Sequence, residues 1–193
     1  MKIGFRQLEY QWRRQLLASA KGHILEPFVG TGKNFRHYPK GIKVTATDTS
    51  ERMMKLARVQ AEQFGIQSSF IVSPLQELQF PPQSFDTIVS TFSLGEFENP
   101  GLLLNLYNEW CKPEGEVLLL EYGLSRYGLV RWLQKKWEPF QYRNSGIHMN
   151  RDMLGIIAGS NLVLKKVDIK YAGTVYLVWA ELEPAAKKTA FSS

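Results

Sequence analysis

The sequence H-I-L-E-P-F-V-G-T-G-K-N, residues 23–34, decides the fold of this chain. A short apolar run ends in the acidic residue Glu26, and two glycines follow at Gly30 and Gly32. Glycine adopts backbone angles that are closed to other residues, and it lets a ligand approach the main chain. The pattern predicts a β-strand, a tight turn and a helix over Thr31–Tyr38, whose first N–H groups have no partner within the helix.

A second apolar run lies at residues 44–47 and ends in Asp48, sixteen residues beyond Gly32. A carboxylate at the tip of a second strand is placed to accept hydrogen bonds from a ribose. In an open α/β sheet, ligands bind outside the carboxyl ends of the strands, where the strand order reverses. We therefore expect a nucleotide-like ligand across Gly30, Gly32 and Asp48. Taken alone, Asp48 also suits a helix-capping or turn role.

The glycine pattern separates two classes of ligand. A nicotinamide site requires G-x-G-x-x-G, but Lys33, Asn34 and Phe35 follow Gly32. An acidic residue ahead of the glycines suits a ligand with a cationic amino-acid end, such as S-adenosylmethionine. The stretch L-E-P-F-V-G-T-G-K-N-F resembles the first motif of class I S-adenosylmethionine-dependent methyltransferases, L/V-E/D-x-G-x-G-x-G, with Phe28 in place of the first glycine.

Three further stretches carry the same resemblance. T-D-T-S-E-R-M-M, residues 47–54, resembles the second motif, which implies that Asp48 holds both ribose hydroxyls and that Met53 lies near the adenine. C-K-P-E-G-E-V-L-L-L-E, residues 111–121, resembles the beginning of the fifth strand, and residues 90–96 follow the fourth strand toward the acceptor. Pro74 stands where many relatives place an aspartate that contacts the adenine, so backbone groups near Leu75 take that contact.

The resemblance implies S-adenosylmethionine as the cofactor and a site without metal. Glu26 is expected to shape the loop that holds the methionine moiety. The expected cofactor-binding residues are Glu26, Pro27, Phe28, Gly30, Thr31, Gly32, Asp48, Thr49, Met53, Pro74, Leu75, Ser90, Thr91 and Phe92. A thiol or phenol acceptor also needs a base, and the candidate catalytic residues are Glu96, Tyr122 and His148.

The fold class that the resemblance implies is α/β. It is a Rossmann-like seven-stranded sheet with helices on both faces and an antiparallel last strand. The nearly continuous apolar run Val117–Glu121 is typical of a parallel strand buried on both faces. Leu162–Tyr171 and Thr174–Leu182 read as a hairpin around Ala172 and Gly173. Helices are expected over Ser50–Phe64, with Ser50 as the N-cap, and over Asn99–Lys112.

We assign residues 1–183 to a single methyltransferase domain and residues 184–193 to a disordered tail. Apolar side chains within residues 3–20 are spaced as in an amphipathic helix. This helix either packs on the sheet or forms an N-terminal lid over the cofactor, residues 1–20, with Tyr10 or Trp12 near the ligand. Cys111 is the single cysteine, so an internal disulfide is excluded, and we interpret it as a structural thiol.

Residues 122–150 form the least generic segment, an insertion expected on the acceptor side. Aromatic and cationic side chains alternate between Tyr122 and Ile147. Three interpretations stay open: an insertion helix that caps the acceptor pocket with Trp132 and Phe140 in its wall, a membrane interface, or a surface that stacks bases and pairs phosphates.

The net charge of +6 favours anionic partners, either lipid head groups or nucleic acid. No apolar run approaches the length of about 18 residues that a membrane-spanning helix needs. We expect a small-molecule or lipid acceptor, peripheral contact with an anionic membrane, and nucleic acid as the less favoured partner. The expected location is the cytoplasm, with a peripheral membrane or mitochondrial site as variants.

The sequence thus predicts methyl transfer from S-adenosylmethionine to a small-molecule or lipid-like acceptor, namely a thiol, a quinol or an amine. The N/D-P-P-Y/F motif of exocyclic-amine methyltransferases is absent after the fourth strand. Two alternatives remain. One is a catalytically inactive methyltransferase-like assembly or binding factor, which Phe28 and Pro74 favour. The other is an RNA methyltransferase that uses the basic patch.

Overall fold

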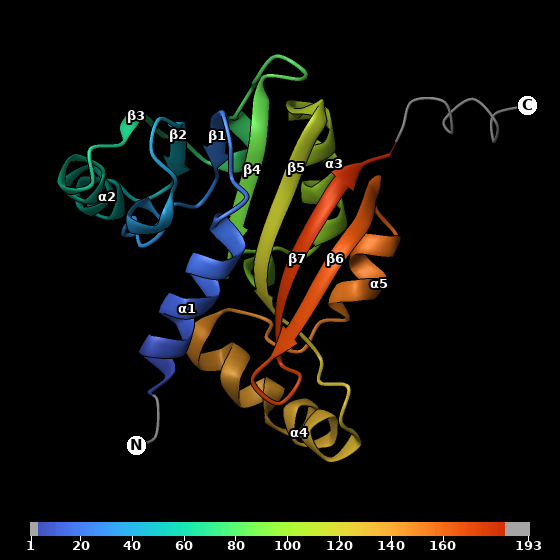
Figure 1. Ribbon diagram of the computed structural model, residues 1–193. Coiled ribbons are helices and arrows are strands. Elements are labelled where there is room, and N and C mark those ends of the chain that lie inside the picture. Colours follow the sequence, from blue (N-terminus) through green and yellow to red (C-terminus); the bar gives the residue numbers. More distant parts are fainter. Residues whose placement is uncertain (1–3, 184–193) are drawn as a thin grey trace, which may run out of the picture.

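A computed structural model describes residues 4–183, apart from the side chain of Ser145. Seven strands form one sheet in the order β3-β2-β1-β4-β5-β7-β6 (Figure 1). Strands β1 to β5 pair in parallel, and β7 runs antiparallel to both of its neighbours. The strands are β1 His23–Glu26, β2 Lys43–Asp48, β3 Gln67–Val72, β4 Phe85–Thr91, β5 Cys111–Tyr122, β6 Leu162–Lys170 and β7 Val175–Leu182.

Helices cover both faces of the sheet, as the fold class requires. They are α1 Phe5–Leu17, α2 Glu51–Gln63, α3 Pro100–Trp110, α4 Gly128–Ser145 and α5 Met153–Ala158, with short 3-10 turns η1 Phe35–His37, η2 Leu75–Glu77 and η3 Leu94–Glu96. The seven-stranded Rossmann-like sheet with an antiparallel last strand is thereby confirmed. The predicted tail, residues 184–193, lies outside the described residues.

Two apolar clusters sandwich the sheet, one under each layer of helices. Leu118 and Leu120 of β5 belong to the cluster beneath α1 and α2, whereas Val117 and Leu119 belong to the cluster beneath α3 and α5. Successive side chains of a strand point to opposite faces. The apolar run therefore marks a strand that is buried on both sides, as its sequence predicts.

The prediction of a helix over Thr31–Tyr38 is wrong. Only the three residues Phe35–His37 form a 3-10 turn. Gly30 and Gly32 adopt φ angles of +55° and +77°, which place them in the left-handed region and prevent a helix from beginning there. The glycine loop consequently presents an irregular main chain, and not a helix N-terminus, to the end of the sheet.

Other boundaries follow the sequence more closely. The Ser50 hydroxyl accepts a hydrogen bond of 3.3 Å from the Met53 N–H, so Ser50 is the predicted N-cap of α2. The helix expected over Asn99–Lys112 ends at Trp110, and Cys111 begins β5, where the register against β4 shifts.

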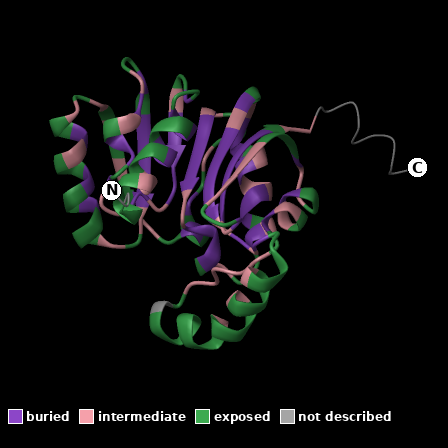
Figure 2. Cartoon of the chain, turned by 60° about the horizontal axis from the view of Figure 1, so that its bottom comes forward, coloured by how far each residue is buried: buried purple, intermediate pink, exposed green. Residues whose placement is uncertain are grey.

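Helix α4 lies across the carboxyl end of the parallel strands (Figure 1). Figure 2 shows that it projects from the body of the protein and is exposed along most of its length. Trp132 and Phe140 are 57% and 63% exposed. Neither residue lines the cavity described below, and the interpretation that they form the wall of an acceptor pocket stays a prediction.

Candidate active site

A cavity of about 400 Å³ lies at the carboxyl ends of β1, β2 and β4. The strand order reverses between β1 and β4, and the space outside such a reversal is where open α/β sheets bind ligands. The volume falls within the range of about 300–1,000 Å³ of small-molecule sites. Its lining residues are Arg13, Phe28, Val29, Gly30, Thr31, Lys33, Asp48, Thr49, Met53, Thr91, Phe92, Ser93 and Glu96.

Asp48 joins the two loops that border this cavity. Its Oδ2 accepts a hydrogen bond of 2.9 Å from the Gly30 N–H, and its Oδ1 accepts one of 2.9 Å from the Ser50 N–H. Each carboxylate oxygen has two lone pairs, so both oxygens can still accept hydrogen bonds from a ligand. The turn role and the ribose-binding role that the sequence left open are therefore compatible in one side chain.

The two glycines of the first loop serve different purposes. A Cβ atom on Gly30 would meet nothing within 4 Å, so this glycine borders open space. A Cβ atom on Gly32 would lie 2.8 Å from Phe35 and 2.9 Å from Ala57. Gly32 therefore permits close packing of the loop on α2, and Gly30 leaves the main chain accessible to a ligand.

Phe28 has the backbone conformation that a glycine would adopt. It occupies the position of the first glycine of the motif, and its φ angle is +58°. Phe92, at the end of β4, has a φ angle of +57° and also lines the cavity. Left-handed backbone costs an L-residue roughly 1–2 kcal/mol, and such strain concentrates at functional sites. The ring of Phe28 packs against Phe97, with a centroid distance of 4.9 Å.

Glu26 lies beneath the loop and does not line the cavity. It is 2% exposed, and it accepts hydrogen bonds of 2.7 Å from Asn34 Nδ2 and 2.6 Å from the Tyr38 hydroxyl. Burial raises the pKa of Glu26 to about 7, although these two hydrogen bonds act in the opposite direction. The side chain thus supports the loop from below, and its predicted role toward the methionine moiety stays a prediction.

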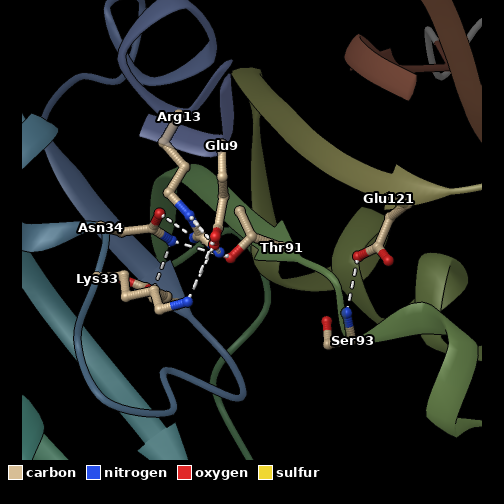
Figure 3. A network of polar contacts seen from close by, with 8 residues as sticks. Glu9, Arg13, Lys33, Asn34, Thr91, Ser93 and Glu121 are labelled. Atoms are coloured by element: carbon tan, nitrogen blue, oxygen red, sulfur yellow. Dashed lines mark hydrogen bonds and ion pairs between the residues drawn. The ribbon is translucent and has the colours of Figure 1, made fainter. Parts of the chain in front are cut away.

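Arg13 of α1 reaches the cavity, a contact that the sequence analysis missed. Its Nη1 donates to Asn34 Oδ1 at 2.6 Å and to Thr91 Oγ1 at 2.8 Å, and its Nη2 donates to Glu9 at 2.8 Å (Figure 3). Lys33 lies 3.2 Å from the same Glu9 carboxylate. The guanidinium therefore connects α1 to the first loop and to the end of β4, and two cations face the cavity.

Neither aromatic residue that we expected near the ligand lines the cavity. Trp12 is buried in the core, and Tyr10 packs against His37 with a centroid distance of 4.6 Å. The amphipathic pattern of α1 could not single out Arg13, because the basic residues on that helix look alike in the sequence.

A second buried carboxylate supports the loop after β4. Glu121 accepts hydrogen bonds from the main-chain N–H groups of Ser93 and Leu94 at 3.1 and 3.3 Å, and from the Ser90 hydroxyl at 3.2 Å. Figure 3 shows the contact between Glu121 and Ser93. Burial raises the pKa of Glu121 to about 7. Ser90 is thus buried behind the cavity, whereas Thr91 and Phe92 line it.

Of the three candidate catalytic residues, Glu96 lines the cavity. Burial and, to a smaller extent, the Asp48 carboxylate raise the pKa of Glu96. Tyr122 stacks behind Phe92 at 4.5 Å, and burial raises the pKa of its phenol, which disfavours the ionised form. His148 stacks on Tyr142 at 4.3 Å and pairs with Glu138 at 3.0 Å. All three assignments stay predictions, and the geometry favours Glu96.

Pro27, Pro74 and Leu75 do not line the cavity. The Ser73 N–H donates to the Asp48 carbonyl at 3.1 Å, which holds the segment before Pro74 beside the tip of β2. A larger hollow of about 1220 Å³ lies at the opposite end of the sheet, next to Cys111 and Gly115. That end carries the amino ends of the parallel strands, where this architecture does not bind its ligands.

The residues at the cavity suit S-adenosylmethionine chemically. Asp48 carries carboxylate oxygens of the kind that pair with ribose hydroxyls, Gly30 exposes main chain, and Met53 and Phe92 line the cavity with apolar surface. Arg13 and Lys33 provide positive charge for a carboxylate. The fold and this set of side chains together define a Rossmann-like domain with a methyltransferase-type cofactor site.

Comparison with known proteins gives the family. Residues 25–119 match the model of a family described as a methyltransferase domain. This match and relatives that are named methyltransferases indicate the class I S-adenosylmethionine-dependent methyltransferase family, whose cofactor is S-adenosylmethionine. A geranyl diphosphate C-methyltransferase from Streptomyces coelicolor, solved with S-adenosyl-L-homocysteine, superposes with a TM-score of 0.72 at 13% identity, covering 92% of this chain and 80% of that one.

Three curated relatives show the spread of the family. A mitochondrial methyltransferase of Saccharomyces cerevisiae is 25% identical over 91% of this chain and 41% of its own length. A phosphatidylethanolamine N-methyltransferase of Cereibacter sphaeroides is 28% identical over 62% of this chain and 60% of its own. A human thiol S-methyltransferase is 32% identical over 63% of this chain and 52% of its own. The chain therefore spans less than two thirds of each relative.

Proposed function

We propose that this protein transfers a methyl group from S-adenosylmethionine to a small-molecule or lipid-like acceptor, namely a thiol, a quinol or an amine. The observation that carries the proposal is the placement of Asp48, Gly30 and Glu96 around one cavity at the switch point of the sheet. Relatives named as thiol and phosphatidylethanolamine methyltransferases support these acceptor classes.

The bound cofactor supplies a methyl group on a sulfonium, which is already a strong electrophile. The protein then mainly has to align the acceptor and exclude water. Asp48 accepts hydrogen bonds from the ribose hydroxyls, and Gly30 lets the main chain approach the ligand. Arg13 and Lys33 offer positive charge to the amino-acid carboxylate.

Glu96 is the group that we assign to proton transfer from the acceptor. It lies on the turn that follows β4 and faces the cavity. A base works best when its pKa is near the working pH, and the raised pKa of Glu96 moves it in that direction. A thiol or quinol acceptor would lose its proton to this carboxylate as its sulfur, oxygen or ring carbon gains the methyl group.

Phe28 argues against the inactive alternative. A decayed motif would be expected to lose the loop geometry together with the glycine, yet Phe28 retains a φ angle of +58° and leaves Gly30 facing the cavity. The first loop therefore keeps the backbone shape that the glycine would provide.

Methyl transfer from labelled S-adenosylmethionine tests this proposal directly. Thiols, quinols and aminophospholipids are offered in turn, and Glu96→Gln is compared with the wild type. We expect product from one acceptor class, a loss of at least about 100-fold in kcat for Glu96→Gln with a thiol or quinol, and unchanged cofactor affinity. Cofactor binding without product from any acceptor would favour the inactive binding factor instead.

A further inference from the structure

Helix α4 turns its polar side toward the protein. Among its described side chains, the three that are half-buried are Val130, Gln134 and Glu138, and the others are exposed. Residues spaced by four lie on one face of a helix. The helix therefore packs on the body of the protein along one narrow stripe, and two of the three residues on that stripe are polar.

Hydrogen bonds hold this stripe in place. Gln134 accepts from the Ser125 N–H at 2.8 Å and donates to the Gly123 carbonyl at 2.9 Å. The carboxylate of Glu138 pairs with His148 Nδ1 at 3.0 Å. These contacts orient the helix by satisfying main-chain groups of the preceding loop, and they leave its apolar side chains out of the core.

One exposed side of α4 is apolar. Leu129, Leu133, Trp137 and Phe140 are spaced by four, four and three residues, so they lie on one face. They are 73%, 42%, 59% and 63% exposed. A contiguous apolar face of this kind on the surface of a protein marks an interaction site. We call Leu129, Leu133, Trp137 and Phe140 the outer face of α4.

Cations outnumber acids on α4. The helix carries Arg131, Lys135, Lys136 and Arg143 against the single carboxylate of Glu138, which faces the body. Arg131 donates a hydrogen bond of 2.8 Å to the Ser125 carbonyl, and Lys135, Lys136 and Arg143 are exposed. The Lys136 ammonium lies 5.1 Å from the ring centroid of Trp132, so a cation and an aromatic ring lie side by side on the surface of α4. An apolar face bordered by tryptophan and by long cationic side chains matches the boundary between acyl chains and anionic head groups.

We propose that α4 docks the protein on the surface of an anionic phospholipid bilayer through its outer face. The helix lies at the same end of the sheet as the candidate active site (Figure 1). Docking would therefore bring the bilayer to the side from which an acceptor enters. Among the described residues, no helix is long and apolar enough to cross a membrane, so the proposed contact is peripheral.

The charges distinguish this partner from a second copy of the chain. A symmetric pair of α4 helices would place the same patch against itself, and with it the exposed cations Lys135, Lys136 and Arg143 of each copy. Like charges in such a contact are destabilising, whereas the surface potential of an anionic leaflet attracts each cation by about 1 kcal/mol. The charge pattern therefore favours lipid over self-association.

Flotation with vesicles tests the docking proposal on the full chain. The wild type should bind vesicles of phosphatidylcholine with phosphatidylserine, and should bind pure phosphatidylcholine at least about 10-fold more weakly. The double variant Trp137→Gln and Phe140→Gln should lose at least about 10-fold in partition, because two exposed aromatic anchors are removed. Neither side chain contributes to the core.

Matched variants distinguish the contribution of the outer face to vesicle binding from the effects of overall charge and hydrophobicity. The triple change of Lys135, Lys136 and Arg143 to Gln should weaken binding by about 100-fold at low salt. The same change at the exposed residues Lys40, Arg52 and Lys55 should weaken it much less. Leu102→Gln, which changes a leucine that is 63% exposed on α3, should leave it unchanged.

The proposal would be overturned by any of the following results. These are no flotation of the wild type, equal loss in the matched variants, or a concentration-dependent dimer that the aromatic double variant abolishes. Preference for an RNA oligonucleotide over the vesicles would also contradict it. Docking needs no turnover, and titration of the same proteins with S-adenosylhomocysteine reports the cofactor site separately, so the two proposals fail in distinguishable ways.

Discussion

The main-chain N–H of Gly30 donates a hydrogen bond of 2.9 Å to Oδ2 of Asp48, and this contact joins the tip of β2 to the loop after β1. Asp48 is therefore part of the wall of the cavity as well as the proposed contact to the ribose. The same carboxylate caps the turn into α2 through the Ser50 N–H. A change at this position has to affect the shape of the first loop as well as the binding of a ribose.

Asp48→Ala is expected to loosen the glycine loop. It leaves the N–H groups of Gly30 and Ser50 without their acceptor, and loss of hydrogen bonds to a charged group costs about 1.5–3 kcal/mol each. Because this site is partly open to water, we expect a total loss of about 1–3 kcal/mol in unfolding free energy and faster amide exchange at Gly30. Asp48→Asn keeps one acceptor, so its unfolding free energy and its amide exchange at Gly30 should lie between those of the wild type and Asp48→Ala. Equal exchange in all three proteins would contradict the structural role.

Phe28 allows a test of the left-handed backbone. Phe28→Ala and Phe28→Gly both remove the ring that packs on Phe97, but only glycine adopts a φ angle of +58° without strain. We expect the glycine variant to be more stable than the alanine variant by about 1 kcal/mol in urea unfolding.

At a control position on a helix, we expect the opposite order of stability for the glycine and alanine variants. Val59 is exposed on α2, where glycine is less favourable than alanine by about 1 kcal/mol. Val59→Gly should therefore be less stable than Val59→Ala. A less stable glycine variant at both positions would rule out left-handed strain at Phe28.

Glu26 should make stability depend on pH. Its pKa is raised from 4.5 to about 7 in the folded protein, so between these values the folded state binds more protons than the unfolded state. Its contribution is fully present below about pH 4.5 and is lost as the pH rises through about 7. From pH 5 to 8 the wild type should lose on the order of 2–3 kcal/mol relative to Glu26→Gln.

A second variant checks the direction of this effect. The Tyr38 hydroxyl lowers the pKa of Glu26 by donating a hydrogen bond of 2.6 Å. Tyr38→Phe should therefore move the loss of stability to higher pH. His37, whose pKa is lowered to about 4 by burial, acts in the opposite direction, so the differences between variants are the informative quantity. If the difference in unfolding free energy between the wild type and Glu26→Gln did not change from pH 5 to 8, the raised pKa of Glu26 would be contradicted.

Arg13 should act on the amino-acid end of the cofactor. Arg13→Gln removes a cation from the cavity, and we expect S-adenosylhomocysteine to bind about 10- to 100-fold more weakly, because a hydrogen bond to a charged group contributes about 1.5–3 kcal/mol. 5′-Methylthioadenosine has no carboxylate, so calorimetry should show a much smaller loss of affinity for it, limited to the effect of the lost contacts to Asn34 and Thr91. Arg14→Gln, an exposed neighbour on the same helix, should alter neither. If both ligands lost affinity equally, Arg13 would not act on the carboxylate of the cofactor.

The sequence was sufficient where short-range chemistry determines structure. The strand that ends in Asp48, the Ser50 N-cap and the buried run Val117–Glu121 all follow from local pattern, and the structure confirms each of them. The resemblance to a known motif then supplied the seven-stranded sheet with its antiparallel last strand, which local pattern does not determine.

The rest depended on contacts between distant parts of the chain. Arg13 reaches the cavity because α1 packs over the loop at Asn34 and the end of β4, and no local signal marks that arginine among its neighbours. The expected helix after Gly30 failed because two positive φ angles interrupt it. The sequence of α4 does not show which side faces the body, because the contacts of Gln134 with Gly123 and of Glu138 with His148 determine it.

Calorimetric titration with S-adenosylhomocysteine tests the central claim most directly. Wild-type protein should bind in the micromolar range, and Asp48→Ala, while still folded, should lose at least about 100-fold in affinity, because the ribose hydroxyls lose a charged acceptor. Binding that is lost in the variant would establish the cavity at Asp48 and Gly30 as the cofactor site. No binding to the folded wild type would contradict the account of this protein as a methyltransferase.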